Sequence, residues 1–98
     1  MLEGILSKNE VPIRLTDERW TQITEEHCEL AGLRLEVIED PSRILAGREG
    51  ELLAVQEISI GKHLVVVYRE FDNDGFIITA FLTSKVKSFN RRTQLWPK

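Results

Sequence analysis

The chain has 98 residues, of which 42% are hydrophobic and 30% are charged. This composition excludes a disordered chain, and the length fits a single domain over residues 1–98 without a linker rich in proline or glycine. No apolar run approaches the roughly 20 residues that cross a bilayer, and the first residues lack the basic and apolar regions of a secretory signal. We therefore expect a cytoplasmic protein that does not enter a membrane.

The sequence has one cysteine and two histidines, too few for a disulfide or a typical zinc site. Cys28 has no internal disulfide partner, and a Cys/His zinc cluster of the usual spacing cannot be built. The segment "EFDNDGF" (70–76) begins like a calcium loop, but the twelfth position, which has to be a bidentate carboxylate, is Phe81. We expect a hairpin turn there, with Asn73 and Gly75 in unusual backbone conformations, and no metal or cofactor.

Charge is distributed unevenly along the chain, whose formal net charge is −3. Residues 76–98 contain five lysines and arginines and no acidic residue, whereas the rest of the chain carries eight basic and sixteen acidic residues. Such a separation suits a nucleic acid bound at the basic end, or attraction between opposite ends of neighbouring molecules.

The N-terminal third predicts a short strand followed by helices. "VPIRL" (11–15) reads as a strand that Pro12 places at an edge or a strand start. Thr16 or Asp17 then caps a helix, whose apolar stripe consists of Trp20, Ile23 and His27. A second apolar pattern ends before Pro41, so two short helices are expected within residues 16–40.

From residue 43 the pattern changes to strands, at 43–47, 51–58, 62–71 and 75–83. Their connections are short and contain glycine, so the strands are expected to be antiparallel neighbours. The tail "KVKSFNRRTQLW" (85–96) is expected to form a short helix. The predicted fold class is α+β, with N-terminal helices packed on a four- to five-stranded antiparallel sheet.

Polar side chains on the last long strand are candidates for a site. Thr79, Phe81 and Thr83 share one face because side chains alternate along a strand. Counting outward from the turn places Arg69 near Ile78 or Thr79, within an error of one or two residues. His27, at a helix end, is either a packed residue or a titrating group, and His63 is expected to be an exposed turn residue.

Several short motifs together resemble a known group of proteins. The order "ITEEH", "DPSRI", "HLVVVYRE" and "GFIITAFLTSK", over about residues 14 to 90, resembles the small phage- and plasmid-associated domains of the barnase, EndoU, colicin tRNase and RelE-like group, the BECR fold. The resemblance implies N-terminal helices followed by a four-stranded antiparallel sheet. It also implies metal-independent RNA cleavage in many members, frequently as the toxin of a toxin–antitoxin pair.

The resemblance implies a helix histidine, a basic strand residue and a late-strand hydroxyl around the scissile phosphate. By position these are His27, Arg69 and Thr79, with Arg43 and Arg48 as alternatives for the basic residue. The residues expected to follow the RNA backbone are Thr83, Lys85, Lys87, Arg91 and Arg92.

Two functions remain open from the sequence. The first is a metal-independent endoribonuclease, whose partners are RNA and a small antitoxin. The second is a non-catalytic module on the same scaffold that binds a protein partner through the sheet edge or the basic tail. Trp20 and Trp96 are candidate anchors of an oligomer interface, and the oligomeric state is left open.

Overall fold

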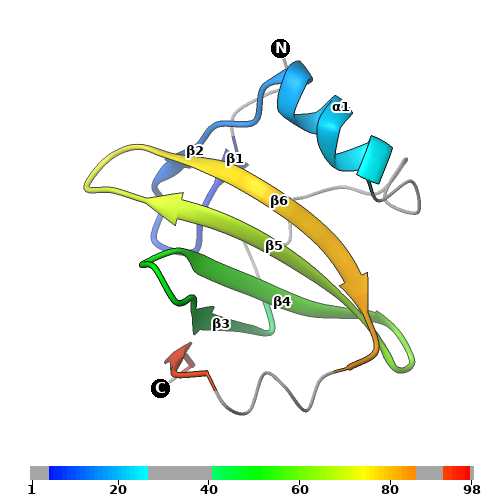
Figure 1. Cartoon of the computed structure of the whole chain (residues 1–98). Helices are drawn as coiled ribbons and strands as arrows, with labels where there is room; N and C mark the ends of the chain where they lie inside the picture. The colour runs from blue at the N-terminus through cyan, green and yellow to red at the C-terminus, as the bar shows by residue number, and fades with distance from the viewer. Residues whose placement is uncertain (1–4, 27–40, 86–91, 98) are drawn as a thin grey trace.

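The computed structural model describes residues 5–26, 41–85 and 92–97. These residues form one helix and seven strands (Figure 1). The elements are β1 (Ile5–Leu6), β2 (Pro12–Ile13), α1 (Asp17–Glu26), β3 (Arg43–Ala46), β4 (Leu52–Ser59), β5 (Lys62–Glu70), β6 (Gly75–Thr83) and β7 (Gln94–Trp96).

Five of the strands form one antiparallel sheet in the order β6-β5-β4-β3-β7, and β1 pairs with β2 in a separate two-stranded ribbon. The four long strands expected from the sequence are confirmed, each within one residue of the predicted bounds. Consecutive strands are neighbours because their connections are too short for anything other than a hairpin. The fold is therefore mixed α+β and consists mostly of sheet.

Helix α1 begins where the sequence predicts. The Arg19 amide donates to the Thr16 hydroxyl oxygen at 3.1 Å, which is the hydrogen bond of an N-cap. Ile23 is buried and Trp20 packs beside it on the sheet. The prediction of several N-terminal helices is not borne out, because α1 is the one helix in the described residues. The second predicted helix lies within 27–40, outside those residues.

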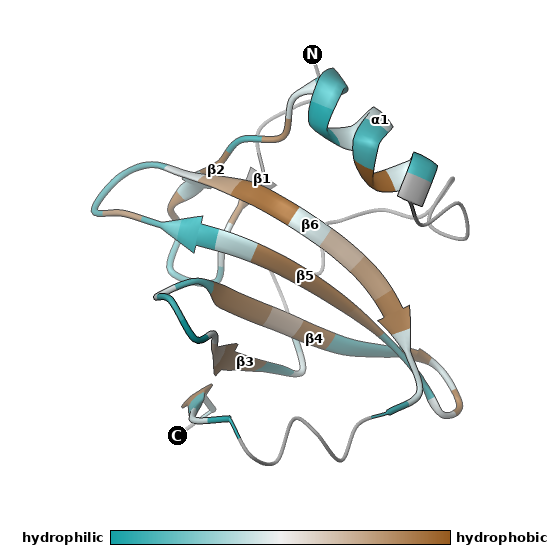
Figure 2. Ribbon diagram, in the orientation of Figure 1, coloured by the Kyte–Doolittle hydropathy of each residue, from teal (hydrophilic) through white to brown (hydrophobic). Residues whose placement is uncertain are grey.

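The large sheet has two apolar faces. On the helix face, α1 and the β1–β2 ribbon cover a buried cluster that contains Ala54, Val66, Tyr68, Ile77 and Ala80. The opposite face, here called the distal face, carries a second cluster made of Leu45, Leu53, Val55 and Val65, against which Val67 and Phe81 pack. Figure 2 shows that the apolar residues run through the middle of β4, β5 and β6. Strands β4, β5 and β6 therefore contribute most of the buried apolar side chains of the sheet.

The C-terminal tail differs from the expected helix. Its described part forms strand β7, in which Trp96 lies opposite Ile44 of β3. The Ala46 amide donates to the Thr93 carbonyl at 2.8 Å, and the Lys8 ammonium lies 4.5 Å from the centre of the Trp96 ring. Extended pairing satisfies backbone groups along the edge of β3, which a helix would leave to solvent.

The turn between β5 and β6 also differs from expectation. Among the described residues, backbone φ is positive only at Glu10, Gly50 and Gly61, so the prediction of unusual angles at Asn73 and Gly75 is wrong. A Cβ atom on Gly75 would overlap the Arg69 carbonyl oxygen. Glycine is needed there because two backbone segments approach closely.

Strand β6 contains one residue more than its partner. Thr79 lies opposite Val67 while Ile77 lies opposite Tyr68, so Ile78 is the additional residue of a β-bulge. Ile77 and Tyr68 belong to the cluster on the helix face, and Val67 packs on the distal face. The bulge therefore places Thr79 on the distal face.

Candidate functional site

Arg69 and Thr79 lie on the same face of the sheet. Val67, opposite Thr79, packs on the distal face, and Arg69 is two residues further along β5, so its side chain projects from that face too. Diagonal neighbours of this kind are about 7–8 Å apart. Arg69 pairs with Phe76, two residues from Ile78, because the hairpin turn occupies residues 71–74 and not 72–75.

The Arg69 guanidinium is held at the β3–β4 turn. Its Nη2 donates to the Glu49 carbonyl oxygen at 2.9 Å. Arg48, an alternative basic residue, is exposed in the same turn. Arg43, the other alternative, lies opposite Val55 at the far end of β3 and is half-buried. The structure thus groups Arg69 with Arg48 and separates both from Arg43.

A hollow of about 280 Å³ lies beside the end of β6. It is lined by Lys62, Leu82, Thr83, Ser84 and Lys85. The Thr83 hydroxyl oxygen accepts a hydrogen bond from the Lys85 amide at 3.0 Å, so the chain turns at this point and brings Lys85 back toward the strand. Two ammonium groups and two hydroxyls in one hollow are groups that bind an anion such as a phosphate.

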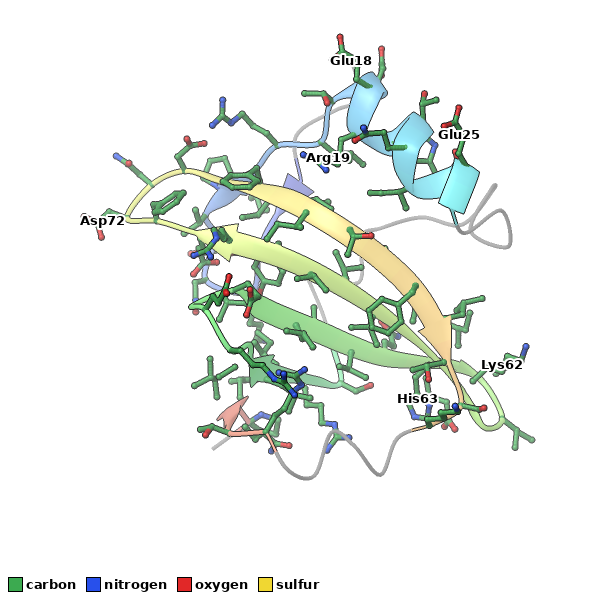
Figure 3. All side chains as sticks on the ribbon, in the orientation of Figure 1. Glu18, Arg19, Glu25, Lys62, His63 and Asp72 are labelled. Carbon is green, nitrogen blue, oxygen red and sulfur yellow. The ribbon has the colours of Figure 1, made fainter. Side chains whose placement is uncertain are left out.

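His63 lies next to this hollow and was misjudged from the sequence. It is half-buried within β5, opposite Thr83, and is not an exposed turn residue. Its Nδ1 is buried and finds no hydrogen-bond partner in the described residues. Figure 3 shows His63 and Lys62 at the end of the sheet where β6 terminates, with Asp72 at the opposite end. The register of the β5–β6 hairpin, which pairs residue 63 with residue 83 or 84, is the feature of the sequence that indicates this position of His63.

The predicted site residues that the structure describes fall into three groups. Thr83 and Lys85 belong to the hollow, whereas Arg92 lies at the β3–β4 turn, where its Nη1 approaches the Ala46 carbonyl oxygen at 3.4 Å. Arg69 is at the same turn, and Thr79 lies between the two ends on the distal face. His27, Lys87 and Arg91 lie outside the described residues.

Two carboxylates near the β5–β6 turn, those of Glu70 and Asp74, make contacts with the N-terminal segment. Groups of three or more metal-binding side chains are absent from residues 5–26, 41–85 and 92–97. Asp74, in the segment that begins like a calcium loop, instead accepts a hydrogen bond from Arg14 at 2.9 Å. Glu70 accepts hydrogen bonds from Ser7 and from Asn9. These contacts fasten the β1–β2 ribbon and the residues after it to the β5–β6 hairpin.

Comparison with protein-family models, curated proteins and solved structures found no match. In the part of the chain that the structure describes, there is no helix with the length and apolar character required to cross a membrane. The case for a function therefore depends on the residues of the distal face and of the hollow beside it.

Proposed function

We propose that the protein binds single-stranded RNA along edge strand β6, at the margin of the distal face, and cleaves it without a metal ion. The observation that carries the proposal is the hollow beside β6, which Lys62, Thr83 and Lys85 line and where His63 is the strand partner of Thr83. Arg69 and Thr79 lie further along the same face. The motifs that resemble the barnase, EndoU, colicin tRNase and RelE-like group support the same reading, and an RNA target suits a cytoplasmic protein.

The side chains match what metal-independent cleavage requires. The reaction needs a base for the 2′-hydroxyl proton, an acid for the leaving oxygen, and donors that stabilise the crowded phosphorane. An imidazole supplies the proton transfer. If His27 supplies it, as the resemblance implies, Thr79 donates to the reacting phosphate. If His63 supplies it, the reacting phosphate is bound at Thr83, which lies opposite His63, and Thr79 donates to a neighbouring phosphate. In both cases Arg69 binds a backbone phosphate further along the RNA.

The spacing along β6 suits a polymer. Thr79 and Thr83 are four residues apart on one face, which corresponds to about 13 Å at the rise of a strand. Lys62 and Lys85 at the end of this line are suited to bind a backbone phosphate. A strand of RNA on this surface thus meets hydroxyl and cationic groups at successive positions.

Cleavage of labelled RNA in the presence of a chelator tests the proposal. The wild-type protein is compared with His27→Ala, His63→Ala and Thr79→Val, with the 2′,3′-cyclic phosphate product as the readout. Loss of the imidazole that transfers the proton should lower the rate by roughly 10²–10⁴-fold. Loss of the Thr79 donor should lower the rate by up to about 10²-fold while the folded structure is kept.

The controls separate binding from cleavage. Lys62→Ala combined with Lys85→Ala should weaken binding of an uncleavable 2′-fluoro RNA and make its dependence on salt shallower. Absence of cleavage by the wild-type protein at high concentration, or equal rates for the wild-type protein and both histidine variants, contradicts a nuclease.

A protein-binding module is a second candidate, because aliphatic side chains are exposed at the β4–β5 turn. Ile60 is 100% exposed and Ile58 is 44% exposed. A small antitoxin or another protein would bury them. Recovery of one stoichiometric protein by the wild-type chain but not by Ile60→Ser, from cells whose growth is unharmed by overexpression, favours this function. Growth arrest on induction favours the nuclease.

A further inference from the structure

A row of charged residues crosses the distal face at the β3–β4 turn. The β4–β5 register pairs Leu52 with Tyr68, so the next position pairs Glu51 with Arg69. The Gly47 amide donates to the Glu51 carbonyl at 2.8 Å, which continues the β3–β4 register by one residue. Across three adjacent strands the row therefore reads Arg69, Glu51, Gly47.

Arg92 completes the row on the far side. Leu45 pairs with Gln94 and the Ala46 amide donates to the Thr93 carbonyl, so the next position brings Arg92 beside Gly47. The Arg92 guanidinium approaches the Ala46 carbonyl oxygen at 3.4 Å. Adjacent strands are about 4.8 Å apart, which places the Arg69 and Arg92 backbones about 14 Å apart. Two extended arginine side chains can converge across such a gap.

Glu51 occupies the space between these two arginines. A Cβ atom on Gly47 would overlap the Glu51 carboxylate, so the Glu51 side chain lies across the glycine toward Arg92. The Glu49 amide donates to Glu51 Oε1 at 2.9 Å. This amide first, and then the charges of Arg69 and Arg92, hold the pKa of Glu51 below its usual value. An ionised carboxylate at this position in the row lowers the positive potential that an external anion would meet at Arg69 and Arg92.

We infer that Arg69 and Arg92 form a second phosphate-binding site on the distal face, and that Glu51 is a built-in carboxylate that competes with the phosphate for it. The inference rests on the proposed function for its ligand, which is a backbone phosphate of RNA. From His63 to Arg69 along β5 is about 20 Å, so a strand of RNA extending from the hollow reaches this second site after several nucleotides. Displacement of Glu51 then accompanies binding of a longer RNA.

Substitutions that remove or displace the carboxylate test the inference. Glu51→Gln removes its charge, and Gly47→Ala retains the charge but forces the side chain out of the space over residue 47. Glu49→Gln is the matched control, because it makes the same change in net charge in the same turn. Binding is measured with a fluorescent 2′-fluoro RNA by anisotropy and with inorganic pyrophosphate by NMR titration, on variants shown by circular dichroism to be folded.

Glu51→Gln and Gly47→Ala should bind both probes roughly three- to tenfold more tightly than the wild-type protein, and Glu49→Gln should bind as the wild-type protein does. Addition of Arg92→Ala to Glu51→Gln should abolish the gain, because the two side chains act on one site. Equal affinities of Glu51→Gln and Glu49→Gln for both probes overturn the inference.

The two probes separate this inference from the proposed function. A gain with pyrophosphate, together with no RNA binding by any variant, supports the second site and contradicts the RNA function. RNA binding that depends on Lys62 and Lys85, with no gain in Glu51→Gln, supports the RNA function and overturns the second site. Failure of every variant to bind either probe overturns both.

Discussion

Tyr68 is a single residue that limits the stability of the sheet at alkaline pH. It is the only tyrosine in the chain, its side chain is fully buried, and its hydroxyl has no hydrogen-bond partner in the described residues. Burial, followed by the nearby charge of Glu70, raises the pKa of Tyr68. Since the folded-state pKa exceeds the unfolded value of about 10, the contribution of Tyr68 to stability is complete below pH 10 and is lost as the pH rises further.

We therefore expect Tyr68 to ionise only as the protein unfolds. An alkaline titration that follows tyrosinate absorbance together with circular dichroism should give one shared transition, with a midpoint above pH 10. Tyr68→Phe should lack the absorbance change and should keep the free energy of unfolding or raise it by up to about 1 kcal/mol, because an unpaired buried hydroxyl is removed. Ionisation near pH 10 with intact circular dichroism contradicts this expectation.

At the scale of elements, two glycines constrain neighbouring strands in different ways. Gly75 meets the backbone carbonyl oxygen of Arg69, which cannot move without disturbing the β5–β6 hairpin. Gly47 meets the Glu51 carboxylate, which lies at the end of a flexible side chain. The space over Gly75 is therefore required by the fold, while the space over Gly47 is required only by the position of one side chain.

This difference predicts unequal costs of adding a methyl group. Gly75→Ala should lower the free energy of unfolding by about 2–3 kcal/mol, as overpacking against a rigid neighbour does. Gly47→Ala should change it by less than about 1 kcal/mol, because the Glu51 side chain can swing away. Urea denaturation of the two variants measures both values, and similar losses would show that Glu51 is as fixed as the Arg69 backbone.

For the whole molecule, protection of backbone amides should follow the order of the strands. β4 and β5 have a strand on each side, whereas β6 and β7 lie at the edges of the sheet and β7 has three residues. Hydrogen exchange followed by NMR should give the slowest amides in β4 and β5, with free energies of opening near that of global unfolding. Exchange in β7 as slow as in β5 would contradict this order. It would show that the Lys8–Trp96 contact stabilises β7 more than expected for a strand of three residues.

The sequence correctly predicted the elements whose conformation is determined by the local pattern of residues. The four long strands follow from alternation and short connections, and α1 follows from Thr16 and the apolar stripe. β7 was predicted as a helix because its conformation comes from pairing with β3, about fifty residues earlier in the chain. The position of His63 beside Thr83, and the row formed by Arg69, Glu51 and Arg92, also arise from pairing between distant segments. Residue type alone does not show such proximity.

The bulge in β6 is the point where the strand absorbs one residue more than regular pairing with β5 requires. Deletion of Ile78 would make Ile77 and Thr79 consecutive, so Ile77 would still face α1 and the Thr79 and Thr83 hydroxyls would still lie on the distal face. Insertion of one residue between Thr79 and Thr83 would instead turn the Thr83 hydroxyl into the apolar layer beneath α1. We therefore expect β6 to tolerate the loss of Ile78 better than the gain of a residue further along the strand.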